Sequence, residues 1–168
     1  MCTANVCRSP MVAAMLRHRL GGHGPTVESA GVRAPEGRPM DRDSAAQLTS
    51  RGIEVPSSTA RQLTAEIVAG ADLVLTATRA HRADVLDLHP RSLRRTFTLL
   101  EFAALGDLVD ATDLAGLVAG AAGARTQGPR SADLRDPIGH PAEVHAEVAI
   151  LAETAVASIA ARLKALGG

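Results

Sequence analysis

The chain has 168 residues, of which 46% are hydrophobic and 21% charged, and its 18 basic and 18 acidic side chains give a formal net charge of zero. This length and composition are typical of one globular domain with a buried core, spanning residues 1–168. The balanced charge argues against binding to nucleic acid or a membrane surface. The apolar stretches are shorter than the roughly 18–20 residues of a membrane span, and the N-terminus lacks the basic start and apolar run of a signal peptide. We therefore expect a cytoplasmic protein with no membrane partner.

The first nine residues after Met1 form a polar motif directly before a predicted helix over residues 10–20. A loop at a helix N-terminus binds oxyanions, because its N–H groups converge and the helix dipole adds partial positive charge. The same surroundings favour the thiolate, the nucleophilic form of a cysteine, and arginine adds a planar pair of donors for phosphate oxygens. We therefore expect Cys2 to be a nucleophile that forms a phosphocysteine intermediate. The predicted phosphate-binding residues are Thr3, Ala4, Asn5, Val6, Cys7, Arg8 and Ser9.

Within this motif two polar side chains have predicted structural roles. Ser9 is placed to hydrogen-bond the Cys2 thiolate and to keep it ionised. Asn5 suits a left-handed turn, since its short side chain bonds the neighbouring backbone.

Strands and helices alternate along the rest of the chain. Predicted strands cover residues 26–30, 71–76 and 95–100, and predicted helices cover 41–51, 64–69 with Thr64 as N-cap, 79–87 and 142–166. Residues 32–39 and 129–141, which are rich in Pro and Gly, are predicted loops. Residues 101–128 are weakly helical and have no predicted position in the fold.

This alternation predicts an α/β fold in three layers, with a parallel sheet flanked by helices on both faces. Ligands of such sheets bind at the carboxyl ends of the strands, which is where a strand–loop–helix unit would place Cys2. A strand of about five or six residues should lead into that loop, but only Met1 precedes Cys2. We therefore expect the first strand to be missing before Cys2, and a chain without it to fold poorly or to be weakly active.

An acidic side chain on the last predicted loop completes the predicted site. Cleavage of a phosphate ester requires a proton donor for the leaving oxygen. Asp136 precedes Pro137, which restricts it to extended geometry on the loop. Asp133 is the competing candidate, with a turn or helix cap as its other role. His140 follows the same loop and is a candidate for the site entrance.

The remaining cysteine and histidine pattern predicts no metal and no cofactor. Cys2 and Cys7 would close a very short disulfide loop, so reduced thiols are expected, and two cysteines give no usual four-ligand zinc set. The histidines are scattered, and His81 is expected at a solvated helix position. They are His18, His23, His81, His89, His140 and His145.

The N-terminal motif resembles the active-site loop of the low-molecular-weight protein tyrosine phosphatases. Further segments of the chain are similar to that family in the same order: 29–31, 37–41, 52–53, 60–63, 71–75 and 133–137. The resemblance implies that the parallel sheet has four strands. It implies Cys2 as nucleophile, Arg8 as the binder of the transition state and Asp136 as acid and then base, without a metal. It also implies that Cys7 can pair with the nucleophile under oxidation, and that the partner is a phosphorylated protein or a small phosphate monoester.

The residues after the Asp-Pro pair depart from the family pattern, and Val6 stands at a position that differs between members of the family. Aromatic residues usually follow the Asp-Pro pair, whereas Ile138-Gly139-His140 follow here, so stacking on a phosphotyrosine ring is expected to be weaker. Val6 stands where tyrosine-directed members carry a β-branched apolar residue and an arginine-phosphate-directed member carries Thr. Val6 therefore favours an aryl phosphate over phosphoarginine. The oligomeric state is not predicted.

Two alternatives to a phosphatase remain at this stage. An arsenate reductase uses the same fold and loop, although the thioredoxin-coupled type needs two cysteines after Cys7, where this chain has none; a type coupled to a small thiol stays open. The second alternative is a truncated, weakly active anion-binding domain, because of the first strand expected to be missing.

Overall fold

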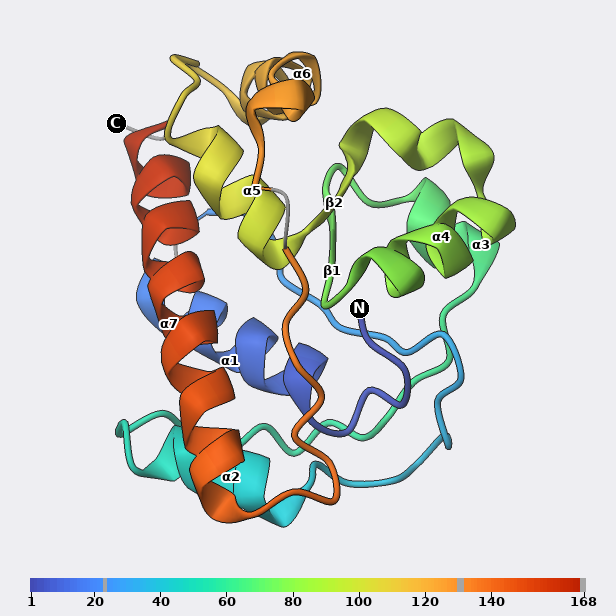
Figure 1. Ribbon diagram of the computed structural model, residues 1–168, viewed down its shortest axis with the longest axis vertical. Coiled ribbons are helices and arrows are strands. Elements are labelled where there is room, and N and C mark those ends of the chain that lie inside the picture. Colours follow the sequence, from blue (N-terminus) through green and yellow to red (C-terminus); the bar gives the residue numbers. More distant parts are fainter. Residues whose placement is uncertain (23, 130–131, 167–168) are drawn as a thin grey trace.

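A computed structural model of the chain describes residues 1–22, 24–129 and 132–166. Helices dominate, and two short strands lie in the middle of the sequence (Figure 1). In chain order the elements are α1 (Arg8–Leu20), α2 (Arg42–Thr49), α3 (Ala65–Ala69), β1 (Val74–Thr76), α4 (Arg79–Leu88), the 3-10 helix η1 (Pro90–Arg95), β2 (Thr96–Thr98), α5 (Leu99–Gly106), α6 (Leu114–Gly123), the 3-10 helix η2 (Arg125–Gln127) and α7 (Ala142–Ala165).

The sheet is parallel and has two strands within the described residues. Val74 lies opposite Thr96, and the register continues to the end of both strands. Next to β1, the backbone N–H of Ala77 donates to the Met1 carbonyl at 2.8 Å, and the Met1 amino group donates to the Leu75 carbonyl at 2.7 Å. Burial lowers the pKa of this amino group. The first residues of the chain therefore lie along β1 in a parallel direction.

Two isolated bridges extend this pairing beyond Met1. Cys2 bridges to Gly31 and Gly31 bridges to Gln62, both in parallel. The predicted parallel α/β architecture is confirmed, but residues 26–30 form no strand and only the following Gly31 bridges, while the predicted strand over 71–76 is shortened to β1. Four full strands are not confirmed, and neither is a missing first strand; both stay predictions.

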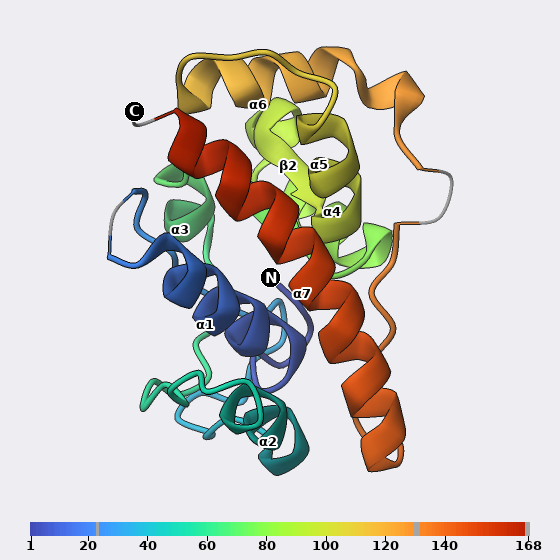
Figure 2. The ribbon, with the colours of Figure 1, turned by 90° about the vertical axis from the view of Figure 1, so that its left-hand side faces the viewer.

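Helices cover both sides of these strands. Figures 1 and 2 show α1, α5 and α7 on one side and α3 and α4 on the other. The larger apolar cluster joins α1, α5 and α7 around Phe97, and a smaller one joins Leu63, Val68, Val74 and Val85 on the opposite side. These two clusters give the three layers that the alternating pattern predicted.

An apolar cavity of about 450 Å³ lies beside Met1. Its walls include Val12 and Leu16 from α1, Leu73 and Leu75 near β1, and part of α7. Arg8 and Ser9 also line this cavity, so it lies next to the loop that precedes α1.

The predicted helices are confirmed with small shifts at their ends, and the weakly helical residues 101–128 contain most of α5, α6 and η2. The predicted strand over 95–100 stops at Thr98, because Thr98 caps α5: its hydroxyl accepts from the Glu101 N–H, and the Glu101 carboxylate accepts from the Thr98 N–H. This reciprocal pair is a capping box, which fixes a helix start. The apolar residues that follow therefore form α5 instead of extending the strand.

Helix α7 is, by length and composition alone, long and apolar enough to cross a membrane. The expectation that every apolar stretch falls short of a span is wrong for this helix. Within the described residues α7 packs against α1 and α5, and nine of its residues are buried. A core helix of this kind passes the same test, so the observation is weak evidence for a membrane span.

Candidate active site

Residues 2–9 form a loop that leads from the sheet into α1. Cys2, Asn5, Cys7, Arg8 and Ser9 are all buried. Among the described residues, no acceptor is found for the backbone N–H groups of residues 4 to 8, and no side chain caps the start of α1. The loop therefore offers a set of unused donors at a helix N-terminus, which is the arrangement that binds oxyanions.

Asn5 fixes the shape of this loop, as the sequence predicted. Its φ of 55° is left-handed, its amide donates to Ser9 Oγ and to Ser29 Oγ, each at 2.9 Å, and its carbonyl accepts from the Arg61 N–H at 3.0 Å. Both amide N–H groups and the carbonyl oxygen of the side chain are thus bonded to the loop or its neighbours. The left-handed turn is therefore held from three sides.

Ser9 connects Asn5 to the thiol of Cys2. The Ser9 hydroxyl accepts from the Asn5 amide and lies 3.0 Å from Cys2 Sγ. Because its oxygen already accepts, its own proton is available to donate to the sulfur. The contact therefore orients the Cys2 sulfur within the loop.

Arg8 joins the loop to the segment before α7. Nη1 donates to the Leu134 carbonyl at 3.0 Å, and Nη2 donates to Asp136 Oδ2 at 2.6 Å. The guanidinium is buried, whereas the Asp136 side chain is 49% exposed. The buried Nε–H of Arg8 has no acceptor. Since a buried donor without a partner costs free energy, a bound oxyanion would satisfy it.

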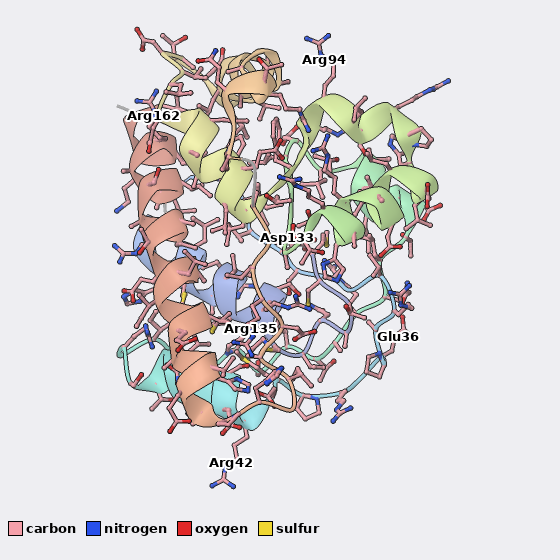
Figure 3. All side chains as sticks on the ribbon, in the orientation of Figure 1. Glu36, Arg42, Arg94, Asp133, Arg135 and Arg162 are labelled. Carbon is pink, nitrogen blue, oxygen red and sulfur yellow. The ribbon has the colours of Figure 1, made fainter. Side chains whose placement is uncertain are left out.

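Figure 3 places Asp133 and Arg135 on the segment between α6 and α7. The Asp133 carboxylate accepts from the Arg79 N–H at 2.8 Å, at the start of α4. Asp133 thus has the cap role that the sequence left open, and Asp136 is the carboxylate that reaches Arg8. His140 is exposed on the following turn, where nothing tests its predicted role.

Gly31 explains how closely the sheet approaches the loop. A Cβ atom on Gly31 would lie 2.5 Å from the Thr3 carbonyl oxygen and 2.8 Å from the Asn5 nitrogen. These are backbone atoms that cannot move aside like the end of a side chain. Only glycine therefore fits at this bridge next to the loop.

Comparison with known proteins decides the family. Residues 1–113 match the family model described as low molecular weight phosphotyrosine protein phosphatase. The chain belongs to this family. It is a cysteine-dependent phosphatase, so the predicted enzyme class is confirmed.

The names of relatives within the low molecular weight phosphatase family give two specificities, for phosphotyrosine and for phosphoarginine. A protein-arginine-phosphatase of Geobacillus stearothermophilus is 32% identical over 164 residues, covering 98% of this chain and 93% of the relative. A probable low molecular weight protein-tyrosine-phosphatase EpsP of Ralstonia nicotianae is 37% identical over 101 residues, covering 60% and 68%. The solved YwlE arginine phosphatase from Geobacillus stearothermophilus matches with a TM-score of 0.77 and 31% identity, covering 97% of this chain and 89% of that one.

His81 supports the loop of this phosphatase, and the sequence analysis missed it. The ring lies between two hydroxyl groups, with Nε2 2.8 Å from Thr3 Oγ1 and Nδ1 2.8 Å from Thr78 Oγ1. Burial lowers the pKa of His81 to about 4, and the Arg8 charge adds to this shift. The expected solvated position is wrong, because His81 shares the inner face of α4 with Val85, four residues on. The four-residue spacing between His81 and the core residue Val85 was the sequence signal that could have predicted the burial of His81.

Cys7 has a different environment from Cys2. Both cysteines are free, but Cys7 Sγ contacts Ser44 Oγ at 2.7 Å instead of the Ser9 hydroxyl. Burial raises the pKa of Cys7 to about 12, and the side-chain hydrogen bond with Ser44 opposes this shift. Cys7 is therefore a protonated thiol at neutral pH, which leaves Cys2 as the candidate nucleophile of the pair. The disulfide implied by the family resemblance stays a prediction.

Proposed function

We propose that Cys2, Arg8 and Asp136 carry out phosphomonoester hydrolysis in two steps. The Cys2 thiolate attacks phosphorus, the bond from phosphorus to the leaving oxygen breaks, and Asp136 gives that oxygen its proton. A water molecule then attacks the phosphocysteine and loses a proton to the Asp136 carboxylate. Inorganic phosphate leaves, and the Cys2 thiolate is restored.

The buried guanidinium of Arg8 carries this proposal. It is pinned by Leu134 and Asp136, yet its Nε–H is unsatisfied. Together with the unused N–H groups of residues 4 to 8, it forms a preorganised set of donors for the equatorial oxygens of a phosphoryl group in transfer. These donors support the proposal that residues 3 to 9 bind the phosphate.

The test is turnover of p-nitrophenyl phosphate by the parent chain and by Cys2→Ser. We expect the parent to be inhibited by vanadate and Cys2→Ser to be inactive, while rapid acid quench of the parent yields phosphate bound to the cysteine. Turnover by Cys2→Ser at the parent's rate would show that the assignment of the nucleophile is wrong. Arsenate-dependent oxidation of NADPH in a thiol-coupled assay would instead favour the reductase alternative.

For the substrate we propose phosphotyrosine in proteins or a small aryl phosphate. The support is Val6, which is buried in an apolar cluster with Cys7 and Ala60 and adds no polar group beside the phosphate. The full-length similarity to an arginine phosphatase makes phosphoarginine the second candidate. Matched peptides carrying one or the other phosphoresidue would distinguish the two through kcat/KM. A higher value for phosphoarginine would overturn the first choice.

We also propose that residues 1–168 are one domain with four parallel strands, in the order 29–31, 1–2, β1 and β2. The bridges of Cys2 and the bonds of Met1 to β1 support this order. Slow amide exchange at Val32 and Ala77, whose N–H groups donate to Cys2 and Met1, would support it; fast exchange at both would contradict it. The free thiols agree with a cytoplasmic location, which stays a prediction.

A further inference from the structure

A second cluster of reactive side chains lies around Cys7, at the end of the loop that leads into α1. It joins Cys7 of the loop, Asp41 at the N-cap of α2, Ser44 in α2 and His145 in α7. Cys7, Ser44 and His145 are buried, with 3%, 1% and 2% of their surface exposed, and the Asp41 side chain is 25% exposed. Three separate parts of the chain thus bring a thiol, a carboxylate and an imidazole together, with one route to solvent along Asp41.

The Ser44 hydroxyl occupies the centre of this cluster. Its oxygen lies 2.7 Å from Cys7 Sγ, 2.9 Å from Asp41 Oδ2 and 3.4 Å from His145 Nδ1. The hydroxyl donates to the carboxylate, so it can only accept from the thiol and the ring nitrogen. The Cys7 thiol is therefore the donor in its contact with Ser44.

The three surrounding donor atoms are those that zinc prefers. Thiolate sulfur, imidazole nitrogen and carboxylate oxygen bind Zn²⁺ at about 2.0–2.3 Å, which places ligand atoms of a tetrahedral site about 3.3–3.6 Å apart. The three atoms already lie within 4.8 Å of one another, and Asp41 Oδ2 is 3.6 Å from His145 Nδ1. The Cys7 sulfur would have to move by about 1 Å to reach the ligand spacing of such a site.

The charges also match. One thiolate and one carboxylate carry two negative charges, which a divalent cation neutralises, and the imidazole binds in its neutral form. A buried site without net charge avoids the large desolvation cost of an isolated ion.

We propose that Cys7, Asp41 and His145 form a binding site for a borderline-soft divalent cation such as Zn²⁺. The Ser44 hydroxyl moves aside, a water molecule takes the fourth position, and the Cys7 thiol proton is released to solvent as the bond from sulfur to the metal forms. No redox change takes place. The Cys7 sulfur takes no part in the proposed hydrolysis by Cys2, Arg8 and Asp136, so the metal site does not depend on that mechanism.

Such a metal would connect the loop to α2 and α7. The Asp41 N–H already donates to the Val6 carbonyl at 2.7 Å, so Asp41 holds the loop through its backbone while its side chain binds the cation. Since binding only to the folded state stabilises it, Zn²⁺ is expected to raise the melting temperature.

The test uses the full chain with Cys2→Ser, which removes metal binding at the candidate catalytic thiolate. Titration with Co²⁺ should produce one thiolate-to-cobalt charge-transfer band and the visible bands of a tetrahedral site, saturating at one equivalent. Zn²⁺ should abolish these bands by displacement. Absence of the thiolate band, in protein shown to be folded by circular dichroism, would overturn the proposal.

Matched variants locate the site. In the Cys2→Ser chain, Cys7→Ser should lose the thiolate band, and His145→Gln should weaken Co²⁺ binding by at least about tenfold. His140→Gln, on the exposed turn, should bind as the Cys2→Ser chain does. Ser44→Ala keeps all three ligands and should retain the band, which covers the case in which a ligand variant fails to fold. Loss of the band in folded Ser44→Ala, or its survival in Cys7→Ser, would show that the metal does not bind at this cluster.

Discussion

At the residue scale, the ion pair of Arg8 and Asp136 joins a candidate phosphate-binding group to a candidate proton donor. Asp136→Asn keeps the shape of the side chain but removes the acid. We expect kcat for phenyl phosphate to fall by about 10²–10⁴-fold. The loss should be smaller for p-nitrophenyl phosphate, because its leaving oxygen needs less help from an acid.

Asp133→Asn is the matched control for this change. It lies three residues away, and its carboxylate contacts the start of α4 instead of Arg8, so kcat should stay close to that of the parent. Equal losses for Asp133→Asn and Asp136→Asn, or equal losses for the two substrates, would contradict the role of Asp136 as acid.

His81 gives a second prediction at this scale. Its pKa is about 4 in the folded protein and 6.5 in the reference state, so the unfolded chain binds the extra proton between these values. The contribution of His81 to the free energy of unfolding is therefore complete above pH 6.5. As the pH drops toward 4, the free energy of unfolding falls by roughly 2–3 kcal/mol because of this group.

Denaturant unfolding at several pH values would measure this effect. His81→Gln cannot take up the proton, so its stability should fall less than that of the parent between pH 6.5 and 4. It should start lower at pH 7, because two buried hydrogen bonds are altered. Parallel curves for the two proteins would show that the His81 ring does not titrate in this way.

At the element scale, Gly31 allows the bridged segment to lie against the loop. Gly31→Ala would force the Thr3 and Asn5 backbone away from the new Cβ. Because displacements of about 1 Å cost on the order of 10²-fold in rate, we expect kcat/KM to fall by about that factor. Gly123→Ala is the control: a Cβ there meets nothing within 4 Å, so activity should be unchanged and stability equal or up to about 1 kcal/mol higher. Activity of Gly31→Ala at the parent level would contradict the close approach.

The elements that could be predicted are those that carry their own local signals. Helix α7 has a long apolar periodicity, and α3 begins at the predicted N-cap Thr64. In contrast, α5 starts inside a continuous apolar run that also suits a buried strand, and only the Thr98–Glu101 contact decides between the two. Periodicity cannot separate a short buried strand from a buried helix.

The same division holds for the site. Cys2, Asn5, Arg8 and Ser9 are neighbours in the sequence, so their cooperation was visible in the motif. The contact of Thr3 with His81 spans 78 residues, and that of Ser44 with His145 spans 101. Contacts of this kind depend on how the helices pack, which no local pattern contains.

At the scale of the whole molecule, oxyanion binding joins parts of the chain that are far apart. Arg8 contacts Leu134 and Asp136, which lie 126 and 128 residues away. Ligand binding to this arrangement exists only in the folded state. Free inorganic phosphate at ten times its Kd should therefore stabilise the fold by about 1.4 kcal/mol, which corresponds to a rise in Tm of roughly 3–6 °C for a chain of this length.

Thermal unfolding in phosphate and in sodium chloride of equal ionic strength would measure this rise. Cys2→Ser should keep it, since binding uses the loop N–H groups and Arg8 without the thiol. Arg8→Met should lose most of it, because the guanidinium is absent. A rise that persists in Arg8→Met would mean that phosphate binds elsewhere. A rise that disappears in Cys2→Ser would mean that the sulfur, and not the loop, holds the anion.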